Sequence, residues 1–226
     1  MNKEQIQAAL AKAKDISSKR NFKQSYDLII NLKGIDKKKQ EHQIDAFITL
    51  PHSRGKKLKI CAIVGPELEE QAKGIYDSVI LPTNFQKYKE KKDVKKVANE
   101  FNFFIAQANI MPKIATTFGR VFGPRGKMPN PKFGGVVPPN ANIKPLYEKL
   151  QRTIRVNTKT APMIQSSIGT EDMDKEEITD NALAIYDSLL HLLPNEKHNI
   201  KDVHIKLTMG KPVKVGEKLK VVKETK

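Results

Sequence analysis

"LKICAIVGPELEEQAKG", residues 58–74, is the stretch that decides the fold. Its first part is apolar almost throughout up to Val64, and Gly65-Pro66 separates it from a polar segment with the pattern of a short helix. Strands that are apolar on both sides are typical of parallel sheets that helices cover on both faces. The stretch therefore predicts a buried strand, a turn and a helix at the start of an α/β unit.

The same alternation continues to about residue 154. Two further apolar strands are expected at 77–82 ("DSVILP") and 102–108 ("NFFIAQA"), with a charged segment between them. Helices are expected at 111–122 and 142–154, and Pro112 is acceptable in a first helical turn. Residues 58–154 thus have the pattern of a parallel sheet with covering helices.

The chain has a different pattern on either side of this unit. One helix and two strands are expected before it, at residues 5–16, 25–34 and 42–51. Two strands and a long helix are expected after it, at residues 162–169, 201–210 and 174–194. Asp174 is the expected N-cap of the long helix, with Glu177 completing a capping box. Because the first pattern returns, we predict a domain of residues 58–154 inserted into a discontinuous domain of residues 1–57 and 155–226.

The charge of the chain points to a polyanionic partner. Its 226 residues include 41 Lys and Arg against 25 Asp and Glu, a formal net charge of +16 that attracts phosphate backbones or anionic membranes. No apolar run approaches the ~20 residues that span a bilayer, and the N-terminal segment is too polar for a secretory signal. The single cysteine, Cys61, cannot form an internal disulfide and suits a cytosolic compartment. We expect a nucleic acid partner and no membrane.

Nucleotide-binding motifs are incomplete in the sequence. In "FGPRGKMPNPKFGGVVPP", residues 122–139, Gly126-Lys127 is similar to the end of a P-loop, but the first glycine is replaced by Val121 and the hydroxyl residue by Met128. Only Gly65 stands where a dinucleotide-binding loop needs three glycines. A Gly-x-Ser-x-Gly signature is absent, and the five histidines lack metal-ligand spacing. We predict no catalysis, no cofactor and no metal; a nucleotide-dependent enzyme built on residues 58–154 is the alternative.

Three segments are candidates for RNA contact. The first is the proline-stiffened loop of residues 122–139, for which a purely structural turn is an equal alternative. Four basic residues lie in or next to it: Arg120, Arg125, Lys127 and Lys132. "KRNFKQSYDLIINL", residues 19–32, places Phe22 among bases, a pattern suited to base stacking and phosphate contact, although Phe22 could instead pack in the core. "IKLTMGKP", residues 205–212, ends a strand with a hydroxyl residue and a glycine.

The segments "NFKQSYDLIINL", "FGPRGKMPNP" and "IKLTMGKPVKV" together resemble the L-one family of large-subunit ribosomal proteins, the universal proteins of the mobile ribosomal stalk. The resemblance covers nearly the whole chain in order. Gln24 and "TEDM", residues 170–173, resemble its archaeal branch. The family implies an α/β protein: an α+β first domain built from both chain ends, and an inserted Rossmann-like three-layer α/β second domain. This agrees with the insertion predicted from the pattern.

The resemblance also implies the residues of an RNA-binding site on the first domain. They are Phe22, Lys23, Gln24, Ser25, Lys159, Thr208, Met209 and Gly210. Asn21 stands where the family often has a basic residue, and Asp202 where relatives have a small hydroxyl residue. The four basic residues of the proline-rich loop are then expected near the interdomain cleft or at a secondary RNA contact.

The function implied is that of a non-catalytic constituent of the large ribosomal subunit in the cytoplasm. Its implied partners are large-subunit ribosomal RNA, the transfer RNA that leaves the exit site, and its own messenger RNA, whose translation it would repress. Outside the ribosome such a protein is expected to be a monomer.

Overall fold

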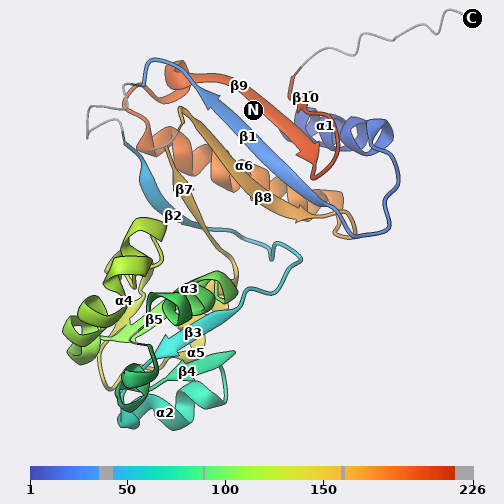
Figure 1. Ribbon diagram of the computed structural model, residues 1–226. Coiled ribbons are helices and arrows are strands. Elements are labelled where there is room, and N and C mark those ends of the chain that lie inside the picture. Colours follow the sequence, from blue (N-terminus) through green and yellow to red (C-terminus); the bar gives the residue numbers. More distant parts are fainter. Residues whose placement is uncertain (36–42, 89, 159–160, 217–226) are drawn as a thin grey trace, which may run out of the picture. The chain divides into compact units, whose positions relative to one another are not determined.

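The computed structural model describes residues 1–35, 43–88, 90–158 and 161–216. The chain divides into two compact units, each with its own sheets (Figure 1). Unit 1 comprises Met1–Lys56 and Ile154–Lys226, and unit 2 comprises Lys57–Thr153. Both units combine helices with sheets, so the predicted α/β class is confirmed. Lys159 lies outside the described residues, as does residue 42 at the start of the second expected strand.

Unit 2 is built on a parallel sheet of four strands. They are β3 (Ile60–Ile63), β4 (Ser78–Ile80), β5 (Phe103–Gln107) and β6 (Val136–Val137), in the order β4-β3-β5-β6. All four residues of β3 are buried, as the apolar run predicts. The short strand β6 was not predicted, because two valines after a glycine pair give no periodic signal.

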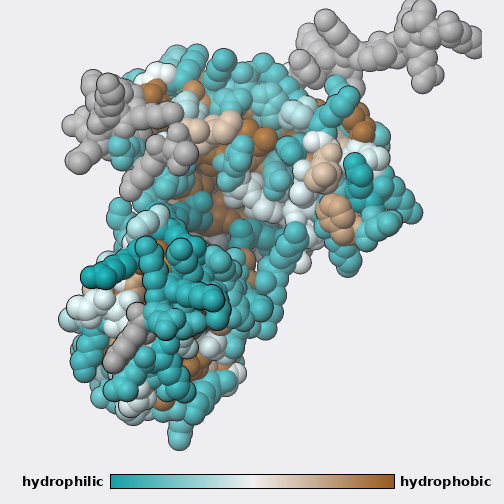
Figure 2. Space-filling view, viewed as in Figure 1, coloured by the Kyte–Doolittle hydropathy of each residue, from teal (hydrophilic) through white to brown (hydrophobic). Residues whose placement is uncertain are grey.

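Helices cover both faces of this sheet. They are α2 (Pro66–Lys73), α3 (Lys91–Glu100), α4 (Met111–Arg125) and α5 (Lys144–Gln151), with short 3-10 helices η2 (Pro82–Tyr88), η3 (Ala108–Ile110) and η4 (Pro131–Phe133). Because β4 and β5 lie on opposite sides of β3, right-handed crossovers place α2 and α3 on opposite faces. α3 and α4 share a core with Phe104, Phe118 and Phe122. Hydrophilic residues dominate the visible surface of unit 2 (Figure 2).

Unit 1 is an antiparallel sheet covered by helices on one face. Its strands are β1 (Ser25–Leu32), β8 (Met163–Thr170), β9 (Ile200–Leu207) and β10 (Val213–Lys214), in the order β10-β9-β1-β8. Alternate residues such as Leu28, Ile30 and Ile205 are buried in one core with α1 (Lys3–Ile16) and α6 (Lys175–Leu192). The 3-10 helix η5 (Glu196–Asn199) precedes β9. The alternation leaves the residues of opposite parity on an open face.

A second, two-stranded sheet of unit 1 pairs β2 (Asp45–Thr49) with β7 (Thr153–Asn157). Arg155 donates two hydrogen bonds of 2.8 Å to the Asp45 carboxylate across this sheet. The helix expected at 142–154 ends at Gln151 instead, and Thr153 already belongs to β7. The β-branched residues Thr153 and Ile154 favour a strand, and their burial there overrides the helical spacing.

Two helix ends differ from the prediction. α4 continues past residue 122 through Pro124 to Arg125 and stops at Gly126, whose φ of 63° is left-handed. The first residues of the proline-rich stretch are therefore helical. Asp174 is the N-cap of α6, but its side chain makes no capping hydrogen bond, so the predicted capping box is wrong.

Candidate nucleic-acid interface

The start of β1 and the end of β9 are held together by Thr208. The Thr208 hydroxyl oxygen accepts a hydrogen bond of 3.1 Å from the Ser25 N–H and donates one of 3.2 Å to the Ser25 carbonyl. The Thr208 N–H donates to the same carbonyl over 3.0 Å. This pairing fixes residues 22–25 against residues 208–210, which together we call the β1–β9 corner.

Gln24 links the corner to two further elements. Its side chain is only 2% exposed, and its Oε1 accepts the Met209 N–H over 3.2 Å. Its Nε2 lies 3.5 Å from the hydroxyl oxygen of Ser17, at the end of α1. Its backbone exchanges hydrogen bonds with Glu171, beyond the end of β8: the Gln24 N–H donates to the carboxylate and the Glu171 N–H to the Gln24 carbonyl. Gln24 therefore positions the corner from the inside and is not itself available to a ligand.

Two large apolar side chains project from this fixed frame. Phe22 is 50% exposed and Met209 is 60% exposed. The alternative that Phe22 packs in the core is therefore wrong. At Gly210 an added Cβ would lie 3.3 Å from both Leu207 Cβ and Ser17 Oγ, so a larger residue would crowd the end of β9. The corner thus offers exposed apolar surface and a hydroxyl on a rigid backbone.

Lys23, which was predicted for this site, and the two positions that depart from the family pattern, Asn21 and Asp202, have different surroundings. Lys23 forms a 2.6 Å ion pair with Asp172, which raises the pKa of Lys23. Asp202 pairs with Lys214, which lowers the pKa of Asp202, and it lies toward the other end of β9. Asn21 is exposed beside Phe22. Of the residues predicted for the site, Phe22, Lys23, Gln24, Ser25 and residues 208–210 lie together at the corner, and Lys159 lies outside the described residues.

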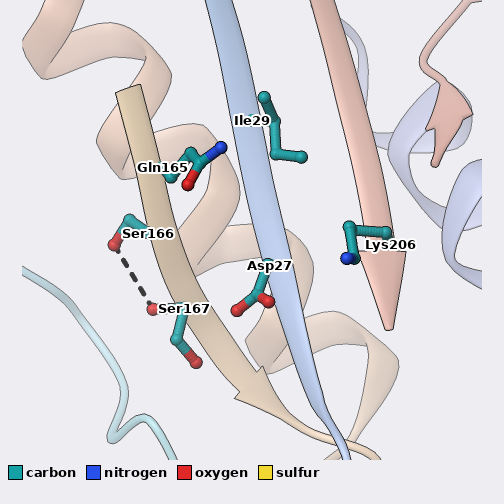
Figure 3. A pocket seen from close by; sticks show the side chains of 6 residues that line it. All are labelled: Asp27, Ile29, Gln165, Ser166, Ser167 and Lys206. Carbon is teal, nitrogen blue, oxygen red and sulfur yellow. Dashed lines mark hydrogen bonds between the residues drawn. The ribbon is translucent and has the colours of Figure 1, made fainter. Parts of the chain in front are cut away.

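The open face of the sheet continues from the corner into a shallow pocket of about 220 Å³. It is lined by Asp27, Ile29, Gln165, Ser166, Ser167 and Lys206, which come from the neighbouring strands β1, β8 and β9 (Figure 3). Burial raises the pKa of the Asp27 carboxyl, and Lys206 and Lys56 oppose that rise. These residues were not predicted from the sequence. The alternation of β1 could have indicated two of them, because Asp27 and Ile29 alternate with the buried residues and so lie on the other face of the strand.

The basic residues near the end of α4 divide into two kinds. Lys127 Nζ donates hydrogen bonds of 2.6 Å to the Ala98 carbonyl and 2.7 Å to the Phe101 carbonyl, and so caps the end of α3. Burial lowers the pKa of Lys127, and the neighbouring Arg125 adds to this effect. Arg125, Arg120 and Lys132 are all exposed, and Arg125 also donates to the side chain of Asn99. Of the two alternatives for the proline-rich loop of residues 122–139, Lys127 therefore supports the structural turn.

The place where a nucleotide would bind in unit 2 is occupied by a side chain. Ligands of open α/β sheets bind where the strand order reverses, here beyond the ends of β3 and β5. There Gln107 Oε1 accepts the Gly65 N–H over 2.8 Å, and Gln107 Nε2 donates to Glu67 over 2.8 Å. Over the described ranges, no group of three or more metal-ligating side chains is found, and no helix is long and apolar enough to cross a membrane.

Comparison with known sequences decides the family. The sequence model of the Ribosomal protein L1p/L10e family matches residues 10–211. The chain belongs to this family. The predicted resemblance is confirmed, and with it the expectation of a non-enzymatic protein.

Archaeal relatives match over most of their length. A protein of Methanocaldococcus jannaschii is 41% identical over 216 residues, which cover 95% of this chain and 96% of the relative. A protein of Nanoarchaeum equitans is 43% identical over 201 residues, which cover 87% and 93%. A third, from Methanothermobacter thermautotrophicus, is 39% identical and covers 94% and 99%. Each is named large ribosomal subunit protein uL1, so the archaeal type of the prediction is also confirmed.

Proposed function

We propose that this chain is a constituent of the large ribosomal subunit in the cytoplasm and binds large-subunit ribosomal RNA through the β1–β9 corner. Family membership and the names of the relatives support the ribosomal role. The observation that carries the site is the corner itself, in which buried polar groups hold the exposed side chains of Phe22 and Met209 in place.

The corner suits a folded RNA better than a regular duplex. Proteins recognise folded RNA by stacking side chains on splayed bases and by contacting 2′-hydroxyls and phosphates along a matching surface. Phe22 offers a ring for stacking, Met209 an adaptable apolar contact and Thr208 an exposed residue beside them, while Gly210 lets the chain turn tightly against Leu207 and Ser17. Gln24 and Ser25 act as positioning residues, because both are buried.

The charge of the chain supplies affinity without selectivity. Lysine and arginine side chains that neutralise phosphates release counterions, so RNA binding weakens as salt is added. The net charge of +16 supports binding of this kind. The corner then determines which RNA is held, and the open face beyond it extends the contact toward Asp27 and Lys206.

The proposal extends to two further RNA partners that the family resemblance implies. On the ribosome, the chain would move with the stalk as transfer RNA leaves the exit site. Off the ribosome, as a monomer, it would bind its own messenger RNA at a segment that imitates the ribosomal site and so repress translation. The messenger RNA would use the same corner as the ribosomal RNA, so these two RNAs should compete for one molecule of protein.

Filter binding with the stalk fragment of large-subunit ribosomal RNA tests the proposal. We expect tight binding that falls with salt and that the leader of the chain's own messenger RNA displaces. Binding no tighter than to an unrelated folded RNA of equal length would contradict the RNA site. Absence of the chain from purified large subunits would contradict the ribosomal role.

A further inference from the structure

Unit 2 carries its charges unevenly on the two faces of its sheet. The exposed side of α2 includes the acids Glu67 and Glu70. The opposite face, formed by α3 and α4, carries basic side chains that we call the α3–α4 basic face: Lys91, Lys92, Lys95, Lys96, Lys113 and Arg120. The acids of α3 are Asp93 and Glu100. α2 and α5 also carry three lysines, but these are balanced by four glutamates, so the excess of positive charge in unit 2 lies on the α3–α4 basic face.

The lysines of α3 are arranged so that they repel one another. Lys91 and Lys95 are four residues apart, as are Lys92 and Lys96, and residues at this spacing are neighbours on a helix surface. Val94 and Ala98 face the core, so both lysine rows lie on the outer side. Lys96 pairs with Asp93 over 3.1 Å, but the other five basic residues form no ion pair within the described part of the chain. The helix tolerates a repulsion that an anionic partner would relieve.

Next to these charges, the surface of α4 has two positions without a side chain. Gly119 and Gly123 lie within the helix, and a Cβ at either position would meet no atom within 4 Å. Alanine favours a helix more than glycine does, so packing within the chain does not explain the two glycines. They leave backbone that a partner can approach closely on either side of Arg120.

The composition of the face indicates what kind of partner it fits. The exposed large apolar side chains of the described residues are Ile16, Phe22, Leu192 and Met209, and all four belong to unit 1. A membrane-binding face needs apolar groups to insert, a protein interface is usually anchored by them, and single-stranded RNA needs aromatic rings for its bases. A face of lysine, arginine and glycine instead matches the phosphate backbone of an RNA duplex, whose bases point inward.

We propose that the α3–α4 basic face of unit 2 is a second RNA-binding surface, which holds the phosphate backbone of double-helical RNA without reading its sequence. The inference goes beyond the proposed function, whose RNA site lies in unit 1. The two surfaces have different chemistry: exposed apolar side chains on a fixed backbone in unit 1, and charge alone in unit 2.

The test compares two full-length triple variants with the same net charge. The face variant is Lys92→Gln/Lys95→Gln/Arg120→Gln; the control, Lys73→Gln/Lys144→Gln/Lys149→Gln, removes exposed lysines of α2 and α5. The probe is an RNA duplex of about 20 base pairs without loops or bulges, and its affinity is measured by fluorescence anisotropy over about 50–200 mM KCl.

We expect the face variant to lose about tenfold or more in affinity, and its slope of log affinity against log salt to fall by about two, while the control slope changes by less than about one. Equal losses in both variants would overturn the proposal, because net charge alone would then explain binding. Wild-type affinity and slope in the face variant would also overturn it, and would indicate an acidic protein surface as the partner of this face.

Discussion

At the scale of single residues, Gln24 and Met209 have different roles in the corner. The Gln24 amide is buried and hydrogen-bonded, and the Met209 side chain beside it is 60% exposed. A buried group that holds another in place contributes to stability, whereas an exposed side chain that contacts a ligand contributes to binding. The two effects separate in the following predictions.

Met209→Ala should weaken binding of the stalk RNA about tenfold or more, because full burial of a methionine side chain contributes about 1.5–3 kcal/mol. Its urea midpoint should stay near that of the wild type, since little apolar surface is lost from the core. Leu192→Ala is the matched control, because Leu192 is also a large apolar side chain and is 44% exposed, at the end of α6. Equal RNA affinities of the two variants would refute the role of Met209.

Gln24→Leu should lower both stability and RNA affinity. The substitution leaves the part-buried Met209 N–H without its acceptor on Gln24, which costs up to about 1–3 kcal/mol. Gln24→Glu keeps that acceptor, although it loses the donor toward Ser17 and adds a carboxylate near Glu171, and we expect it to retain more of both properties than Gln24→Leu. Urea unfolding and filter binding measure the two effects. A Leu variant as tight and as stable as the Glu variant would show that the hydrogen bond to Met209 is unimportant.

At the scale of elements, the sequence predicts the strands better than it predicts how they end. Apolar runs and alternation locate β1, β3, β5 and β9, because burial on one or both faces leaves a direct trace in the sequence. β7 was missed because Ile154 also fits the helical spacing of the preceding segment. The prediction ends α4 too early because Pro124 suggests a break in the helix. In the last turn, however, a proline removes only one backbone hydrogen bond, so the helix continues to Arg125.

The corner and the end of α4 show that sequence alone also predicts the functional residues only in part. Phe22 among bases is compatible with core packing or with RNA contact, and only its exposed position decides between them. Lys127 resembles a phosphate ligand in sequence, but its partners are the carbonyls of Ala98 and Phe101. Every residue has a carbonyl, so no sequence pattern reveals that pairing.

Lys127→Met should destabilise unit 2 by about 1–3 kcal/mol, because two carbonyls at the end of α3 lose a charged donor. Lys132→Met removes the same charge from an exposed side chain and should change stability by less than about 0.5 kcal/mol. Urea denaturation of both variants measures the difference. If the two midpoints are the same, the Lys127 ammonium does not act as the cap of α3.

At the scale of the whole molecule, the two units have separate cores. The buried clusters around β1 and α6 in unit 1 and around β5 and α4 in unit 2 share no residue. Unit 2 is also continuous in sequence, whereas unit 1 needs both ends of the chain. We therefore expect that one unit can unfold while the other remains folded.

Cys61 reports on unit 2 alone. It is fully buried in β3, and burial raises the pKa of its thiol to about 12, so thiol reagents should reach it only when unit 2 opens. Gly55 provides the matching perturbation of unit 1. Its φ is +74°, and a Cβ there would lie 2.4 Å from Thr170 Oγ1, so Gly55→Ala should destabilise unit 1 by about 2 kcal/mol or more.

In a urea titration of Gly55→Ala, the circular dichroism should therefore show an early loss of structure while Cys61 is still protected from a thiol reagent. Labelling should begin at the same urea concentration as in the wild type. Gly74→Ala is the control, because Gly74 has a right-handed backbone and the nearest contact of an added Cβ is 4.0 Å away. Labelling of Cys61 together with the first loss of structure would mean that the two units unfold as one, despite their separate cores.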